Sequence, residues 1–130
     1  MKLNQVIPLM VTVLFKTIPL FIYKNQLFVS IDAICDNLCL DNNFEKDSIR
    51  QGTYISCVMG LNGRTFECIS IDSLTDWLNT IDAEFDTDET VKCPPLLLRY
   101  YQEHLVSKIK EGYIRLVRLK MLTFAGGDRR

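Results

Sequence analysis

The stretch ISCVMGLNGRTFECISI, residues 55–71, decides the fold that we predict for this chain. Asn62-Gly63 at its centre favours a type I′ turn, because Asn and Gly best tolerate the positive φ that both central positions of this turn require. The turn joins two antiparallel strands, 54–61 and 64–71, and fixes their register so that Cys57 opposes Cys68. The same register sets Met59 opposite Phe66 and Leu61 opposite Arg64. The expected core face of this hairpin carries Ile55, Cys57, Met59, Leu61, Phe66 and Cys68.

The segment before this hairpin predicts another hairpin and two short helices. Val11 to Tyr23 and Leu27 to Val29 are rich in β-branched and aromatic residues, with a polar loop at 24–26 between them. Ser30 is a suitable N-cap for a helix that runs to about Leu38. Asp41 or Asn42 is expected to cap a second helix, Asn43 to Gln51, which ends at Gly52 and turns Phe44 and Ile49 inward.

The segment after the central hairpin predicts further helices. Asp72 or Ser73 begins a short helix to about Asn79, which places Leu74, Trp77 and Leu78 on one side. Pro94-Pro95 marks the start of the longest helix, which runs to Gly112 and is followed by a second apolar segment, Tyr113 to Phe124. The expected fold is therefore α+β, with a small antiparallel sheet of two hairpins packed with three short helices and a long carboxyl-terminal helical segment. We expect one domain, residues 1–124, and a flexible tail, residues 125–130.

The composition is that of an ordinary globular protein: 130 residues, 48% apolar and 24% charged. The apolar amino terminus is interrupted by Lys16, Pro8 and Pro19 before it reaches the roughly 18 apolar residues that a membrane span requires. It also lacks the small-residue cleavage site of a signal peptide. We therefore expect a cytoplasmic protein that does not contact a membrane.

The charges are unevenly distributed along the chain, although the net charge is only −1. Residues 31–98 carry 13 acidic and 4 basic side chains, whereas residues 99–130 carry 8 basic and 3 acidic side chains. Such asymmetry favours surfaces of opposite potential and a charged macromolecular partner. The alternative is that the acidic residues only solubilise a small domain.

The sequence contains no recognisable catalytic constellation, so we expect no enzymatic activity and no cofactor. His104 is the only histidine, and neither a phosphate-binding loop nor a dinucleotide fingerprint is present. The five cysteines form no C-x-x-C pair, which favours reduced, buried thiols over a metal site. A weaker alternative is a metal bound by Cys35 and Cys39 together with Cys57 or Cys68.

The order of these segments resembles the amino-terminal domain of phage antirepressor proteins. The resemblance rests on the following residues: Ile34-Cys35 through Leu40-Asp41, Asn62-Gly63-Arg64 with Glu67, Leu74 through Trp77-Leu78 with Ile81, Val91-Lys92, and Tyr100 or Tyr101 with Gln102-Glu103. The chain departs from the family at Cys39 to Asn42, where the family usually has Gly-Leu-Asp-Trp, and we expect no counterpart of the carboxyl-terminal domain of longer members. Similarity to such proteins implies a phage or prophage protein that binds and inactivates another protein, typically a repressor.

Two surfaces are candidates for partner binding. In the first hypothesis an acidic surface covers the basic DNA-reading surface of a repressor, with carboxylates in place of phosphates; its residues are Asp72, Asp76, Asp82, Glu84, Asp86, Asp88 and Glu89. In the second hypothesis the chain binds DNA directly through Lys108, Lys110, Arg115, Arg118 and Lys120. An inhibitor of a bacterial nucleic-acid-targeting defence complex is a further alternative. The apolar segment 113–124 is either a face for homodimerisation or a helix folded onto the sheet.

Overall fold

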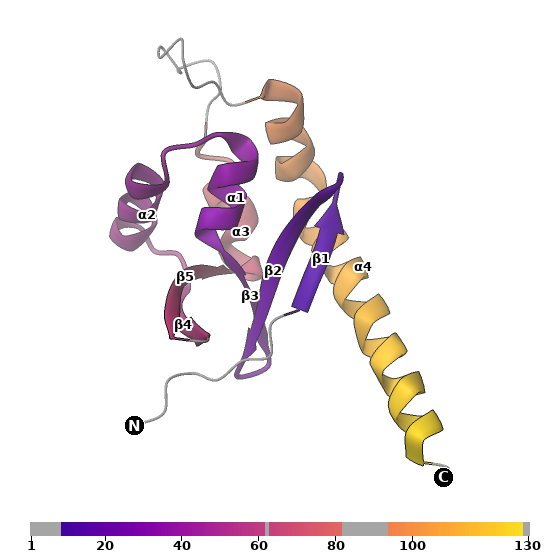
Figure 1. Cartoon of the computed structure of the whole chain (residues 1–130). Coiled ribbons are helices and arrows are strands. Elements are labelled where there is room, and N and C mark those ends of the chain that lie inside the picture. Colours follow the sequence, from indigo (N-terminus) through magenta and orange to yellow (C-terminus); the bar gives the residue numbers. More distant parts are fainter. Residues whose placement is uncertain (1–8, 62, 82–93, 129–130) are drawn as a thin grey trace.

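The computed structural model describes residues 9–61, 63–81 and 94–128. Its centre is one antiparallel sheet with the strand order β1-β2-β3-β5-β4 (Figure 1). The strands are β1 (Leu9–Val13), β2 (Lys16–Tyr23), β3 (Gln26–Ser30), β4 (Ser56–Leu61) and β5 (Arg64–Ser70). Cys57 pairs with Cys68, Met59 with Phe66 and Leu61 with Arg64, so the predicted register of the central hairpin is confirmed.

Four helices complete the described fold: α1 (Ile31–Leu38), α2 (Asn42–Gln51), α3 (Ile71–Leu78) and α4 (Pro95–Asp128). The predicted α+β class, with a long carboxyl-terminal helix, is therefore confirmed. Ser30 caps α1 by accepting a hydrogen bond from the Ala33 amide (3.3 Å), as predicted. Asp41 caps α2 by accepting from the Phe44 amide (3.0 Å).

The main core lies between one face of the sheet and the helices. Val29 and Ile69 in the central strands are fully buried, as are Trp77 of α3 and Tyr101 of α4. Burial of large apolar side chains is worth about 1.5–3 kcal/mol each, so this layer dominates the folding energy. A smaller cluster occupies the opposite face of the sheet and contains Phe21, Phe28, Met59 and Cys68.

The fold contains an internal repeat, which the sequence analysis missed. Ser30-Ile31-Asp32 at the start of α1 recurs as Ser70-Ile71-Asp72 at the start of α3, and each triplet follows directly from a hairpin. Val29 pairs with Ile69 where the two copies meet, flanked by the pairs Phe28–Ser70 and Ser30–Cys68. The sequence offset that relates Ser30 to Ser70 also relates Phe28 to Cys68. Each flanking pair is therefore converted into the other when the two copies are interchanged. An approximate two-fold rotation therefore relates β2-β3-α1 to β4-β5-α3.

The amino-terminal strand prediction is corrected in one respect. The stretch predicted as a single strand, Val11 to Tyr23, divides into β1 and β2 at a tight turn formed by Leu14 and Phe15. Both residues have positive φ, 51° and 67°, which Leu and Phe rarely adopt. The apolar turn carries none of the usual turn residues, so sequence signals did not indicate it. The predicted polar loop that follows is confirmed as a turn at Lys24 and Asn25.

Three local predictions were wrong. Phe44 is 66% exposed rather than turned inward, because α2 buries Ile49 and Glu45 instead. Ile55 precedes β4 and is 48% exposed, so it does not belong to the expected core face; the rest of that prediction holds for Met59 and Cys68, which are fully buried in the smaller cluster. Helix α3 begins at Ile71, because the Ser70 hydroxyl accepts a hydrogen bond from the Asp72 amide (3.2 Å), so neither Asp72 nor Ser73 is the cap.

Helix α4 is continuous from Pro95 to Asp128 and does not end at Gly112. Its helical structure includes 125–128, which the sequence assigned to a flexible tail. Gly112 lies against β1, where an added Cβ would stand 2.8 Å from Cγ1 of Val11, a buried core residue. The glycine therefore permits the close approach of helix and strand and does not end the helix. The second half of α4 extends away from the sheet (Figure 1).

Replacing Gly112 with Ala tests this packing. Alanine favours a helix interior by about 1 kcal/mol, but its methyl group would overlap the stiff side chain of Val11, and overpacking of this kind typically costs about 1–3 kcal/mol. We expect Gly112→Ala to lower the free energy of unfolding in urea titrations. In the Val11→Ala background, where the side chain that would overlap is shorter, Gly112→Ala should lower the free energy of unfolding by less than it does in the original chain. An additive double-mutant cycle would contradict the proposed contact.

Glu45 is a buried carboxyl group that joins α2 to α3. It is 9% exposed, and its Oε1 accepts a hydrogen bond from the indole N–H of Trp77 (3.1 Å). Burial raises the pKa of Glu45 above its ordinary value of 4.5, although the bond from Trp77 opposes this shift, and the charge of Asp41 adds to it. The folded chain therefore holds this proton more tightly than the unfolded chain does.

Glu45→Gln should change how stability depends on pH. Because the folded-state pKa is raised, the contribution of Glu45 is fully present below the unfolded-state value and is lost as pH rises through the folded-state value. Glutamine keeps an oxygen for the Trp77 N–H but does not titrate. The free energy of unfolding of the variant should thus improve relative to the original chain between pH 4 and pH 7. A constant difference across this range would contradict the argument, and Glu103→Gln on the exposed side of α4 serves as the control.

Candidate functional site

The structure describes two of the seven acidic residues predicted to bind a partner. Asp72 and Asp76 lie one turn apart on α3, and both are exposed. The other five lie outside the described residues: Asp82, Glu84, Asp86, Asp88 and Glu89.

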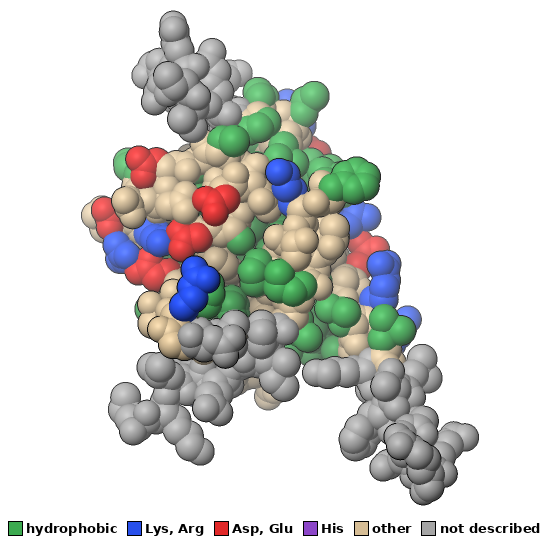
Figure 2. Space-filling view, viewed as in Figure 1, with side chains coloured by type: hydrophobic (Ala, Val, Ile, Leu, Met, Phe, Trp, Pro, Cys, Tyr) green, Lys and Arg blue, Asp and Glu red, His purple; other side chains and the backbone are tan. Residues whose placement is uncertain are grey.

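Further acidic side chains lie on α1 and α2 and were not included in the predicted site. Asp32 and Asp36 of α1 occupy the repeat positions that correspond to Asp72 and Asp76. The acidic helical layer, as we name it, consists of Asp32, Asp36, Asp41, Asp47, Asp72 and Asp76. Figure 2 shows acidic side chains gathered over α1 and α2, and Lys and Arg along α4 on the other side of the molecule. The repeated Ser-Ile-Asp triplet was the sequence signal that could have revealed this layer.

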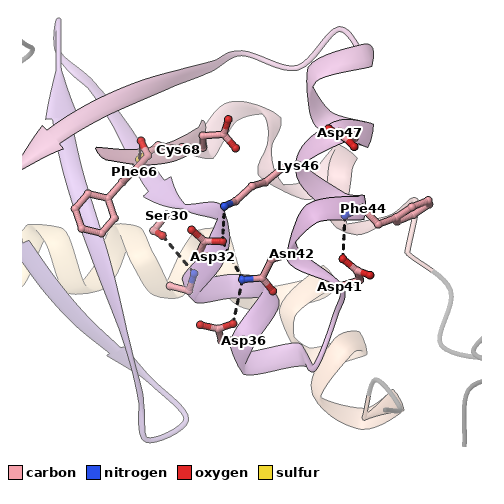
Figure 3. A network of polar contacts seen from close by, with 12 residues as sticks. Ser30, Asp32, Asp36, Asp41, Asn42, Phe44, Lys46, Asp47, Phe66 and Cys68 are labelled. Carbon is pink, nitrogen blue, oxygen red and sulfur yellow. Dashed lines mark hydrogen bonds and ion pairs between the residues drawn. The ribbon is translucent and has the colours of Figure 1, made fainter. Parts of the chain in front are cut away.

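Helix α2 holds the two acidic residues of α1 in place (Figure 3). The side-chain amide of Asn42 donates to Asp32 (2.8 Å) and to Asp36 (3.1 Å). Lys46 lies one turn farther along α2 and pairs with Asp32 at 2.8 Å. This hydrogen bond raises the pKa of Lys46, so the ammonium group remains charged at neutral pH.

Arg50, one further turn along α2, contacts acidic groups on two elements. Its guanidinium group pairs with Glu67 of β5 and with Asp47 on its own helix. The hydrogen bond to Glu67 raises the pKa of this exposed Arg50. Asn42, Lys46 and Arg50 thus form a stripe on α2 that faces acidic groups of α1 and β5. Even with this stripe, residues 31–78 carry eight acidic and three basic side chains, so the layer keeps an excess of negative charge.

The predicted basic residues do not form one continuous surface. Lys108 and Arg115 lie on the same side of α4, and together with Tyr100 they line a hollow beside the end of β1. Lys110 lies on a different side of the helix, because two residues correspond to about 200° of rotation. Arg118 is exposed on the extended half of α4, and the side chain of Lys120 lies outside the described residues. Lys108 also pairs with Glu111 (3.5 Å), which reduces its availability.

The turn between β1 and β2 is a functional candidate that the sequence analysis missed. Phe15 is 95% exposed and Leu14 is 45% exposed, and both occupy the left-handed region of φ. An exposed apolar turn with strained backbone lies next to the hollow that contains Lys108 and Arg115. The arrangement places an aromatic residue beside a hollow lined by Lys108 and Arg115.

The described thiols and imidazole do not assemble a reactive centre. Burial raises the pKa of Cys35 and of Cys68 to about 12, so both thiols stay protonated and weakly nucleophilic at neutral pH. His104 is exposed, its ring is tilted by 50° against that of Tyr100 with ring centroids 5.0 Å apart, and its Nε2 lies 3.8 Å from Oε1 of Glu103. Cys35, Cys39, Cys57 and Cys68 are free thiols, and Cys93 lies outside the described residues. Within the described ranges, no group of three His, Cys, Asp or Glu side chains is placed to hold a metal ion.

Alkylation rates should follow this difference between buried and exposed thiols. Cys39 is exposed in the turn after α1, whereas Cys35 and Cys68 are fully buried. At pH 8 we expect iodoacetamide to modify Cys39 at least tenfold faster than Cys35 or Cys68, as followed by peptide mass spectrometry. In denaturing urea the three rates should converge. Rapid modification of Cys68 in the native chain would contradict the burial described here.

In the part of the chain that the structure describes, no helix is long and apolar enough to cross a membrane. No protein-family model matches the chain, and searches of curated proteins and of solved structures found no match either. The resemblance to phage antirepressors therefore stays a prediction.

Proposed function

We propose that this chain is a phage- or prophage-encoded antagonist that binds a DNA-binding regulator protein through its acidic helical layer. The single observation that carries the proposal is the separation of charge between α1–α3 and α4 on one small scaffold. A regulator that reads DNA presents Lys and Arg to phosphates, and a surface of carboxylates complements the same side chains. The chain would then act by occupying the regulator, one molecule for one binding surface, without turnover.

The way in which the acidic groups are held supports this proposal. Asp32 and Asp36 are oriented by Asn42 and Lys46, so their positions are set before a partner arrives. Preorganised groups lose less conformational entropy on binding than mobile side chains do. Asp72 and Asp76 repeat the same spacing on α3, and among the described residues neither forms an ion pair. The layer therefore combines two oriented carboxylates with two that remain open to an external cation.

Release of operator DNA from a regulator is the direct test. Each DNA-binding regulator encoded by the chain's own genome and by its host would be bound to labelled operator DNA, and release on addition of the chain would be followed by fluorescence anisotropy. We expect Asp36→Lys/Asp76→Lys to weaken release at least tenfold, since both substitutions replace attraction by repulsion. Higher salt should weaken the original chain more than this variant, because salt screens exposed charges.

A control of equal charge separates the layer from the net charge of the chain. Glu103→Lys/Glu111→Lys changes the charge by the same amount on α4, where both residues are exposed. We expect this control to release DNA within about twofold of the original chain, because exposed charges away from an interface contribute little. Equal losses in the two double variants would reject the acidic layer as the binding surface. Failure of the chain to release any regulator would reject the antagonist itself.

Direct DNA binding is a second candidate, favoured by one observation. Lys108 and Arg115 share a hollow with Tyr100 beside the exposed apolar turn of β1 and β2. In this case the chain alone would bind labelled duplex DNA, with affinity that falls steeply as salt increases. Lys108→Glu/Arg115→Glu would abolish such binding, and Asp36→Lys/Asp76→Lys would strengthen it. These opposite responses distinguish the two candidates in the same assay.

A further inference from the structure

A hollow of about 420 Å³ lies at the start of α3, next to the turn between β2 and β3. Asp72 is the acidic residue of its lining, and Asn25 and Gln26 are the polar uncharged ones. The apolar part of its lining is Ile22, Leu27, Ile71 and Tyr113. This volume lies in the range of roughly 300–1,000 Å³ that is typical of ligand sites. It suits a single long side chain better than a whole helix.

The internal repeat shows what fills the equivalent place in the other half of the fold. The two-fold relation takes Asp72 to Asp32 and Leu27 to Glu67. Asp32 is paired with Lys46 at 2.8 Å, and Glu67 is paired with Arg50, both from α2. At this equivalent place, then, Asp32 and Glu67 are each paired with a cationic side chain of α2.

Helix α4 takes the place of α2 in the second repeat but does not bring a cation to Asp72. Asn42 of α2 contacts Asp36 in the second half of α1 and Arg50 lies farther along, so α2 runs antiparallel to α1. Gln102 of α4 donates to the carbonyl of Leu78 at the end of α3 (2.9 Å), and Tyr113 lies near its start, so α4 runs antiparallel to α3. Tyr113 thus lines the hollow together with Leu27, whereas Arg50 pairs with Glu67, the residue that corresponds to Leu27. The result is an aspartate beside an aromatic ring and an open space.

We propose that this hollow binds an arginine side chain of the partner protein. The inference rests on the proposed function, because it identifies the feature of the regulator that the acidic layer recognises. Asp72 accepts two N–H groups of the guanidinium, and the amide oxygens of Asn25 and Gln26 accept others from its five donors. The ring of Tyr113 stacks on the planar cation, and Ile22 and Leu27 cover its aliphatic stem. Arginine fits this set better than lysine does, because an ammonium group offers neither a flat face nor a fork of donors.

The probe for this site is Nα-acetyl-L-arginine N-methylamide, which presents the side chain as a protein does. We expect saturable amide shifts at Leu27, Asp72 and Tyr113 in ¹H–¹⁵N spectra, with a dissociation constant in the low-millimolar range. The citrulline analogue, which is neutral and nearly isosteric, should bind at least tenfold more weakly, and so should the lysine analogue. Free L-arginine should also bind more weakly than the capped probe, because its charged α-ammonium and α-carboxylate groups replace neutral amides and would lose solvent against the apolar lining of the hollow. This comparison distinguishes a peptide arginine from the free amino acid.

Two variants and a control complete the test. Asp72→Asn should weaken probe binding at least tenfold, whereas Asp76→Asn, one turn away and outside the hollow, should leave it within twofold. Tyr113→Arg should abolish binding, because it supplies the internal cation that Arg50 provides in the first repeat. Equal binding of the arginine and citrulline probes, or full binding by Asp72→Asn, would overturn the arginine site. Shifts at Leu27 and Tyr113 that depend on chain concentration without probe would assign the hollow to a second copy of the chain and would also overturn it.

The same variants separate this inference from the proposed function. If the probe binds as described while no regulator releases its DNA, the arginine site stands and the antagonist proposal fails. If a regulator is released with equal efficiency by the original chain and by Tyr113→Arg, the antagonist proposal stands and the hollow is not its contact with the regulator. The two proposals together predict that Asp72→Asn and Tyr113→Arg lose both probe binding and release. Glu103→Gln, at an exposed position of α4 outside both the acidic helical layer and the hollow, should retain both.

Discussion

The pairing of β3 with β5 is the constraint on which the rest of the structure depends. Val29 and Ile69 face each other there in the middle of the sheet, and each strand leads without a loop into a helix capped by a serine. This junction sets α1 and α3 on the same core, since both helices bury their apolar sides with Val29 and Ile69. It also sets the acidic positions, because Asp32 and Asp72 are the second residues of their helices and point away from that core. The charge of the surface therefore follows from the packing of the interior.

The sequence predicts this fold well where local chemistry is unambiguous. The central hairpin register, the Ser30 cap and the start of α4 at Pro95 each follow from a turn or cap preference that tertiary contacts support. The turn at Leu14 and Phe15 was not predictable in this way, because an apolar pair with positive φ contradicts local preference. Gly112 was misinterpreted because a glycine needed for contact with Val11 looks, in sequence, like one that ends a helix. Such contacts are set by distant residues, which periodicity along the chain cannot show.

The candidate site was predictable only in part. Sequence reasoning identified an acidic surface but centred it on residues 82–89, beyond the described part of the fold. The oriented carboxylates of α1 depend on Asn42 and Lys46, and these contacts arise only when α2 folds back along α1. The hollow at Asp72 depends on the approximate two-fold relation and on Tyr113, which is distant in sequence. The two similar halves thus pack against different helices, α2 and α4. This difference explains why Asp32 is paired within the chain while Asp72 is left for a partner.

Hydrogen–deuterium exchange of the chain, free and bound to a regulator, is the most direct test that the hollow at Asp72 is left for a partner. Binding should slow exchange at the start of α3, at the turn between β2 and β3, and around Tyr113, because these segments surround the hollow. Exchange along α2 should change little, since its cations are already engaged with Asp32 and Glu67. Protection confined to the side of α4 that carries Lys108 and Arg115, with none at α3, would contradict it.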